Sequence, residues 1–198
     1  MRLWYTPTSP YGRKVMVTAM EAGLDKKIEI RSNYTESPER NLWRDNPLGK
    51  IPALALGDGK TLMDSPVICE YLDSINRKKK LFPAKGWRRW TALRQQAVAD
   101  GIMDASLLRR QEALRPETLR STDADALQKG KVARSLDVLE KEAKDLSGSL
   151  TIGHVAVACA LGYLDLRFAA DEWRKGRPKL AAWFEKISKR PSFARTKP

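Results

Sequence analysis

The segment NPLGKIPAL, residues 46–54, places a proline where an apolar strand begins. Proline has no backbone N–H to donate to a neighbouring strand, so Pro52 belongs at the start or the edge of a strand. One solution is a cis peptide bond between Ile51 and Pro52. It would leave the backbone amide and carbonyl of Ile51 free to pair with an extended ligand. A trans proline at a strand start is the alternative.

Turn signals mark the elements around this segment. Residues 51–56 and 61–63 are predicted to be short strands, because Gly57-Asp58-Gly59 between them is typical of a hairpin turn. Residues 27–31 alternate between polar and apolar side chains, as a half-buried strand does. The other predicted elements of this half are a strand at 2–5, a helix from Ser9-Pro10 to Gly23, a short helix after Ser37-Pro38 and a helix at 65–75. The order is βαβ followed by αββα.

The second half of the chain has helical spacing and no strand signal. The predicted helices are 87–114, 123–146, 151–168 and 178–190. The basic stretch at 78–86, which ends FPAKG, interrupts the pattern as a linker does. We therefore expect one domain at 1–77, a linker at 78–86 and an all-helical domain at 87–198.

The net charge of +13 is concentrated in two short stretches. Residues 78–90 contain six basic residues and no acidic one, and residues 174–198 contain nine basic residues against one acidic. No motif that reads nucleic acid accompanies them, so we expect a solvated basic face and no nucleic-acid partner. The longest apolar run, 155–164, is shorter than the roughly 20 residues that cross a bilayer. Residues 1–7 lack a signal-peptide pattern, and we expect a cytoplasmic protein without a membrane span.

Two further segments combine a helix start with polar side chains. In TSPYGRK, residues 8–14, Ser9 is a favoured N-cap and Pro10 a favoured first helical residue. Asp64-Ser65-Pro66 is a second helix start of this kind, preceded by a carboxylate. Helix N-termini attract anions, and Asp64 could pair with an ammonium, so the second segment fits an α-amino acid head group. Each segment taken alone is also compatible with simple helix capping.

The combination of Ser9, Pro52 and Asp64-Ser65 at these spacings resembles the glutathione S-transferase family, in its bacterial, serine-type form. The resemblance covers essentially the whole chain. It implies an α/β thioredoxin-like N-terminal domain followed by an all-α helical bundle. It also implies a homodimer that binds glutathione and a small hydrophobic electrophile.

The resemblance assigns roles to individual residues. Ser9 would face the glutathione sulfur, and Ile51 with Pro52 would pair with the cysteinyl backbone. Asp64 and Ser65 would hold the γ-glutamyl group, and Lys50 is placed for the glycyl carboxylate.

The group that activates the glutathione thiol is predicted to be a hydroxyl. Ser9-Pro10-Tyr11-Gly12 stands where thioredoxin-like oxidoreductases carry Cys-x-x-Cys, and it contains no cysteine. A free thiol has a pKa of about 8.5, so a hydrogen bond from Ser9 and a helix N-terminus would favour the thiolate. Tyr5 at the end of the first strand is the rival hydroxyl. Tyr11 is a candidate wall of the electrophile pocket, together with Trp87, Trp90, Met103 and Leu107.

Three other side chains invite a role. The only histidine, His154, follows Thr151 at the spacing of a capping box, which makes it structural. Asp104 could reach the γ-glutamyl ammonium of a second subunit, or it could be a solvated carboxylate. One histidine and two cysteines in apolar helices, Cys69 and Cys159, suit neither a metal site nor a disulfide framework.

Two alternative functions stay open at this point. Glutathione-dependent reduction of peroxides or disulfides needs the same thiolate as conjugation. A non-catalytic interaction module with a transferase fold would suit the basic linker and tail. The intact set of Ser9, Pro52, Asp64 and Ser65 favours a glutathione enzyme, because a scaffold has no physical need of it.

Overall fold

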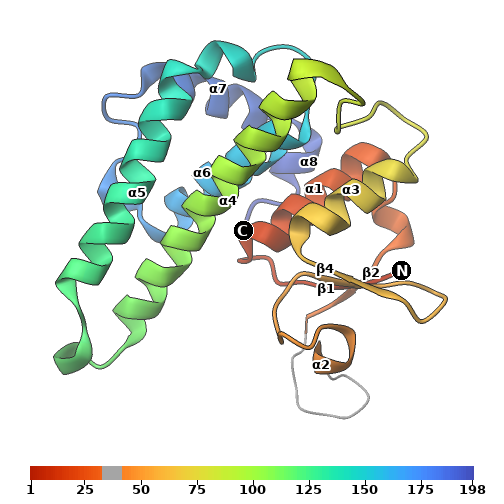
Figure 1. Cartoon of the computed structure of the whole chain (residues 1–198), viewed down its shortest axis with the longest axis horizontal. Coiled ribbons are helices and arrows are strands. Elements are labelled where there is room, and N and C mark those ends of the chain that lie inside the picture. The colour runs from red at the N-terminus through yellow and green to blue at the C-terminus, as the bar shows by residue number, and fades with distance from the viewer. Residues whose placement is uncertain (33–41) are drawn as a thin grey trace.

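The computed structural model describes residues 1–32 and 42–198 (Figure 1). In this part of the chain four strands form one mixed sheet in the order β2-β1-β3-β4. β1 and β2 are parallel, and the other two pairs are antiparallel. The strands are β1 Arg2–Trp4, β2 Glu29–Arg31, β3 Ala53–Ala55 and β4 Thr61–Met63. The helix expected after Ser37-Pro38 lies outside the described residues.

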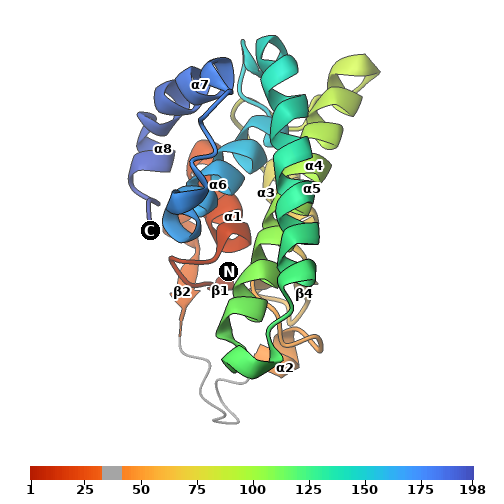
Figure 2. The same ribbon diagram turned by 90° about the vertical axis from the view of Figure 1, so that its left-hand side faces the viewer.

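Helices α1 and α3 pack against each other on one face of the sheet, and α1 also packs against α6 of the helical half (Figures 1 and 2). α1 (Pro10–Ala22) starts at its cap Ser9, as predicted. It ends where Gly23 adopts φ 69°, a left-handed conformation that glycine takes without steric cost. α3 spans Ser65–Ser74, and the short α2, Leu42–Asp45, precedes the NPLGKIPAL segment.

The second half is a helical bundle, which confirms the predicted fold class. Its helices are α4 Gly86–Leu114, α5 Thr122–Lys141, α6 Ile152–Arg167, α7 Pro178–Ser188 and α8 Pro191–Ala194. The helix expected at 123–146 ends at Lys141, and a 3-10 turn continues it over Ala143–Leu146. Other 3-10 turns lie at Asp25–Lys27, Glu117–Leu119 and Ala169–Asp171. None of the helices in the described ranges is long and apolar enough to span a membrane.

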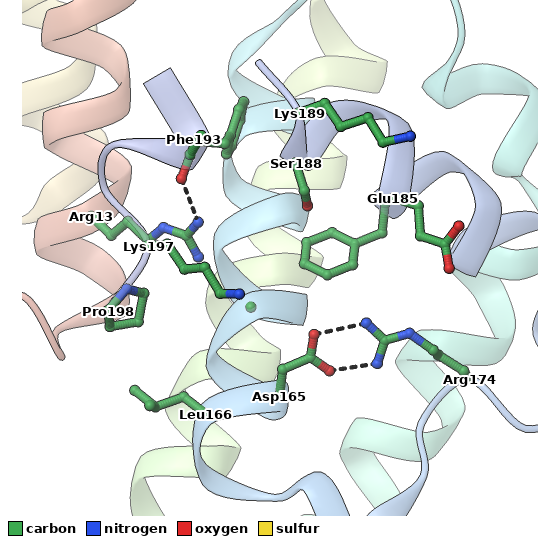
Figure 3. A pocket seen from close by; sticks show the side chains of 13 residues that line it. Arg13, Asp165, Leu166, Arg174, Glu185, Ser188, Lys189, Phe193, Lys197 and Pro198 are labelled. Atoms are coloured by element: carbon green, nitrogen blue, oxygen red, sulfur yellow. Dashed lines mark hydrogen bonds and ion pairs between the residues drawn. The ribbon is translucent and has the colours of Figure 1, made fainter. Parts of the chain in front are cut away.

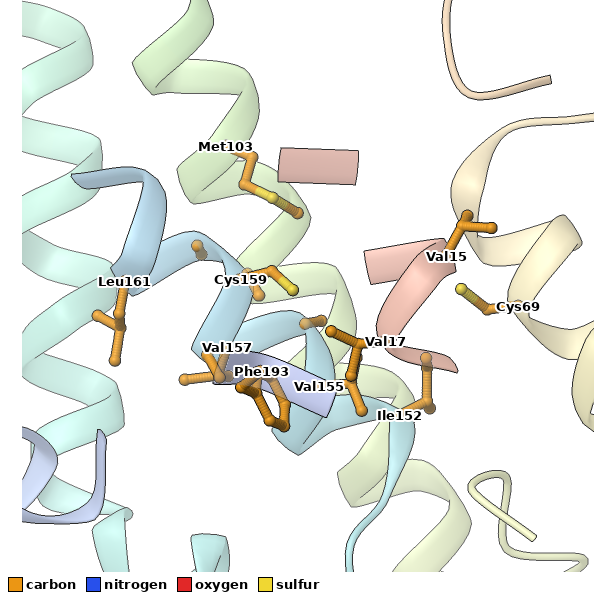
Figure 4. Packing of buried hydrophobic residues seen from close by; sticks show 14 of the residues in the cluster. Val15, Val17, Cys69, Met103, Ile152, Val155, Val157, Cys159, Leu161 and Phe193 are labelled. Atoms are coloured by element: carbon orange, nitrogen blue, oxygen red, sulfur yellow. The ribbon is translucent and has the colours of Figure 1, made fainter. Parts of the chain in front are cut away.

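The core is centred on α6 and is continuous between the two halves. Figure 4 shows Val155 of α6 beside Val17 of α1 and Cys159 of α6 beside Met103 of α4, while Val15 of α1 lies beside Cys69 of α3. Gly153 lets α6 approach α4 closely, because a Cβ there would lie 2.7 Å from the carbonyl oxygen of Ala92. Both cysteines are buried, and burial raises the pKa of Cys69 to about 12 and that of Cys159 to about 11. Neither thiol is ionised at neutral pH.

Candidate functional site

Strand pairing brings the three sequence motifs to one end of the sheet. Trp4, the last residue of β1, is in register with Ala53, the first residue of β3. Ala53 is in turn in register with Met63, the last residue of β4. The segment that leads to Ser9, the Ile51-Pro52 segment and the segment that starts at Asp64 therefore all adjoin the same end of the sheet.

Ser9 lies at this end of the sheet, and its hydroxyl can still donate a hydrogen bond. Its Oγ accepts a hydrogen bond from the backbone N–H of Gly12 at 3.1 Å, which caps α1. Within the described ranges no acceptor takes its hydroxyl hydrogen. The side chain is partly exposed, so a ligand at the helix N-terminus could receive that hydrogen bond.

The rival hydroxyl, Tyr5, belongs to the core. It is 9% exposed, and its ring packs so closely on Gly12 that a Cβ there would lie 2.5 Å from Tyr5 Cδ2. Burial raises the pKa of Tyr5, and the Arg13 guanidinium acts in the opposite direction. The geometry therefore favours Ser9 over Tyr5 as the group that meets a ligand.

The Ile51–Pro52 peptide bond is cis, the first of the two solutions that the sequence allowed. Asn46 fixes the preceding turn, since its Nδ2 donates to the Lys50 carbonyl at 2.7 Å and its Oδ1 accepts from the Leu48 N–H at 3.0 Å. No backbone hydrogen bond joins Ile51 to another described residue. The Lys50 side chain is exposed, and no described carboxylate lies within 4.0 Å of its ammonium.

Asp64 and Ser65 form the third part of the site. Asp64 caps α3, and its Oδ1 accepts from the Ser65 N–H at 2.7 Å. It holds φ 68°, a region that residues other than glycine seldom adopt and that is concentrated at ligand sites. Ser65 is fully buried, and in the described part of the chain its Oγ has no hydrogen-bond partner. A buried hydroxyl without a partner costs stability, so a ligand contact would explain it.

Helix α4 adds carboxylates next to these residues. The hydroxyl of Tyr11 donates to Asp104, and the fully buried Lys14 pairs with Asp100 at 2.6 Å. Burial raises the pKa of Asp100; Lys14 opposes this, and the charges of Asp64 and Asp104 add to it. Burial and the bond to Asp104 raise the pKa of Tyr11. The result is a negative region around Asp64, which suits a ligand ammonium.

Two pocket candidates were wrong. Trp87 and Trp90 precede Asp104 by 17 and 14 residues on the same helix, about 20–25 Å away at the rise of an α-helix. They are 82% and 59% exposed. Helical spacing placed them on α4 but could not tell how far along it the site lies. Met103 is fully buried in the core, whereas Leu107 is partly exposed near Asp104.

His154 has the structural role that its spacing predicted. Its Nδ1 accepts from the Thr151 N–H at 3.2 Å at the start of α6, and burial lowers its pKa. The described residues contain no group of three His, Cys, Asp or Glu side chains that could hold a metal.

Sequence reasoning missed the Lys14–Asp100 pair. A lysine followed by Val15, Val17 and Thr18 within a helix is a weak signal of burial. The sequence does not indicate which carboxylate pairs with it, because Asp100 is 86 residues away.

Comparison with known families decides the affiliation of the chain. The model of the glutathione S-transferase N-terminal domain matches residues 8–75, and that of the glutathione S-transferase C-terminal domain matches residues 95–186. The chain belongs to the glutathione S-transferase family.

Individual relatives match this chain over essentially its whole length. The uncharacterized GST-like protein YibF of Escherichia coli K12 is 35% identical over 100% of this chain and 98% of its own length. A glutathione transferase family member from Pseudomonas fluorescens Pf-5 was solved with bound glutathione. It has a TM-score of 0.94 and 45% identity, covering 100% of this chain and 98% of that one. A structure of a Pf-5 family member with bound S-(propanoic acid)-glutathione has a TM-score of 0.92 and 44% identity, covering 100% and 99%.

Proposed function

We propose that this chain is a glutathione transferase in which the Ser9 hydroxyl donates a hydrogen bond to the glutathione sulfur and holds it as a thiolate. The thiolate attacks a small hydrophobic electrophile, in a reaction that serves detoxification. A hydroxyl at the N-terminus of α1 supports this role, because both the hydrogen bond and the helix dipole favour the ionised sulfur. The helix and the cap hold the donor in place before the sulfur becomes charged, which is how such donors act.

Groups of this chain that match the peptide part of glutathione lie at the same end of the sheet. The free backbone of Ile51, before the cis Pro52, would pair with the cysteinyl unit. Lys50 would meet the glycyl carboxylate, and Asp64 would meet the γ-glutamyl ammonium. The observation that carries the proposal is the fully buried, unpartnered Oγ of Ser65 beside Asp64. A γ-glutamyl carboxylate at the start of α3 would supply its missing partner.

Conjugation fits these residues better than disulfide exchange through protein thiols. Cys69 and Cys159 are buried, and their raised pKa values keep them protonated. The relative bound to S-(propanoic acid)-glutathione supports a site that tolerates a group on the sulfur. Tyr11, between α1 and α4, would form one wall of the electrophile pocket.

Ser9→Ala tests the role of the hydroxyl. Glutathione affinity, measured by calorimetry, should survive, because Ile51, Asp64 and Ser65 are unchanged. Turnover of an activated aryl chloride at neutral pH should fall by roughly tenfold to 150-fold, the value of one hydrogen bond to a charged group. The rate should recover in part as the pH rises and the thiolate forms unaided.

Ser121→Ala is the matched control for the lost cap. Ser121 caps α5 in the same way, with its Oγ accepting from the Ala124 N–H at 3.2 Å. Both variants should lose about 1 kcal/mol of stability, but only Ser9→Ala should lose turnover. Full turnover in folded Ser9→Ala, together with loss of turnover in Tyr5→Phe, would transfer the role to Tyr5.

We further propose a cytoplasmic homodimer, in keeping with the family. Sedimentation should give about twice the 22.4 kDa mass of the chain at micromolar concentration. A mass near that of one chain would contradict this assembly.

A further inference from the structure

A cavity of about 720 Å³ lies on the far side of α1 from the Tyr11–Asp104 contact, between α6, α7, α8 and the segment that ends at Pro198. Figure 3 shows Asp165 of α6, Glu185 and Ser188 of α7 and Lys197 around it. The glutathione site proposed above uses none of its lining residues. Arg13 is the residue that α1 contributes to it.

Arg13 brings a buried positive charge to this cavity without a carboxylate partner. Its side chain is 5% exposed. Nη2 donates to the Phe193 carbonyl at 3.1 Å, and Nε donates to Thr196 Oγ1 at 3.4 Å. No described carboxylate lies within 4.0 Å of the guanidinium. A buried charge costs free energy unless a counter-charge or full hydrogen bonding compensates it. An anion bound at this guanidinium would therefore be stabilising.

The third nitrogen of the guanidinium lies at the wall of the cavity. A Cβ on Gly162 would be only 2.3 Å from Arg13 Nη1, so the absence of a side chain at Gly162 makes room for this nitrogen. No described acceptor bonds to Nη1. Two of the three nitrogens therefore form hydrogen bonds with the C-terminal segment, and Nη1 remains available to a ligand.

The other charges around the cavity leave it positive. Asp165 is already engaged by Arg174, with two hydrogen bonds of 2.6 and 2.8 Å, and by the indole of Trp173 at 2.6 Å. Lys197 and Lys189 have no carboxylate partner in the described ranges, and Figure 3 shows the Lys197 side chain reaching into the cavity. Of the acidic side chains that line the cavity, Asp165 and Glu185, only Glu185 has neither an ion pair nor a hydrogen bond within the described residues. A carboxylate from outside would balance Arg13 and Lys197.

We propose that this cavity binds a small organic anion with a flat apolar body, such as an aryl carboxylate. Its carboxylate would meet Arg13 Nη1 and Lys197, and its ring would lie among Phe184, Phe193 and Leu166, which also line the cavity. A volume of about 720 Å³ is within the range of small-molecule pockets. Leu166 is 37% exposed, so the apolar body of an organic anion would cover surface that a bare phosphate would leave facing water.

Calorimetry with naphthoate, in the presence of saturating glutathione, tests the proposal without using turnover. Naphthoate should bind one per chain, and naphthylmethanol, which has the same ring and no charge, should bind at least tenfold more weakly. Arg13→Gln should weaken naphthoate binding by roughly tenfold to 150-fold, the value of a charge-assisted hydrogen bond. Lys197→Ala should weaken it less, because the ammonium is partly solvated.

Two further variants keep the test decisive if Arg13→Gln does not fold. Gly162→Ala should displace the guanidinium and weaken naphthoate binding while leaving the charge of the chain unchanged. Lys175→Ala removes an exposed cation outside the cavity and should leave the affinity unchanged. The proposal is overturned if naphthoate does not bind, if it binds as tightly to Gly162→Ala and Lys197→Ala, or if naphthylmethanol binds as tightly. A folded chain that binds naphthoate but not glutathione would overturn the proposed function alone.

Discussion

Replacing Lys14 with methionine should destabilise this protein strongly. Lys14 is fully buried, and its Nζ lies 2.6 Å from Asp100 Oδ1, whose side chain is 19% exposed. Methionine fills nearly the same volume without a charge, so the packing of α1 changes little. The buried carboxylate loses its partner. Breaking a buried ion pair from one side costs about 3–5 kcal/mol, and the partial exposure of Asp100 favours the lower end, about 3 kcal/mol.

The pH dependence separates this mechanism from a simple loss of packing. Burial already raises the pKa of Asp100, and Lys14 opposes that rise, so removing Lys14 raises it further. A carboxyl whose pKa is raised in the folded state destabilises the fold progressively as the pH rises above its unfolded pKa, about 3.9. The free energy lost in Lys14→Met should therefore be larger at pH 7 than at about pH 5.

Urea unfolding at both pH values measures the effect. Adding Asp100→Asn to Lys14→Met should recover part of the loss at pH 7, because the remaining buried group is neutral. Lys26→Met, at an exposed lysine, should change stability by no more than about 0.5 kcal/mol. A loss in Lys14→Met below about 1 kcal/mol at pH 7, or a larger loss at pH 5, would refute the reasoning.

Two further predictions concern His154 and Tyr11. Because burial lowers the pKa of His154, protonation below about pH 6.5 should destabilise the fold. His154→Gln, whose amide oxygen can still accept from Thr151, should flatten the drop in Tm between about pH 7.5 and pH 5.5. An equal drop in both proteins would contradict this. Tyr11→Phe removes the donor to Asp104 and should cost about 1.5 kcal/mol in urea unfolding. Unchanged stability would contradict this, because it would show that water replaces the hydrogen bond to the solvated Asp104.

The sequence predicted those parts of the fold that depend on local signals. Ser9-Pro10 and Gly23 fix the ends of α1 because capping involves only neighbouring residues. The strand expected at 51–56 is shorter, Ala53–Ala55, because Pro52 cannot donate and Leu56 already belongs to the turn. The short helix α8, Pro191–Ala194, was missed. It has one turn, which is too short for a periodic pattern, and its Phe193 is buried against distant segments.

The contacts around the site could not be predicted in the same way. Tyr11 and Asp104 are 93 residues apart, and Arg13 and Phe193 are 180 apart. Each side chain has an ordinary place in its own helix, and only the packing of α1 against α4 and α8 brings the partners together. The error at Trp87 has the same cause, because helical spacing gives the face of α4 but not the distance along it.

The first turns of α1 connect these observations. Tyr11 and Lys14 bind Asp104 and Asp100 on α4, whereas Arg13 binds the Phe193 carbonyl on α8. Successive helical residues point in different directions, so three nearby side chains reach both sides of the helical half. Ser9 precedes them, and its carbonyl accepts from the Arg13 N–H at 2.9 Å. The position of the Ser9 hydroxyl therefore depends on residues far away in the sequence. A chain cut after residue 77 would expose Lys14, leave Arg13 without its acceptors and open one wall of the shared core.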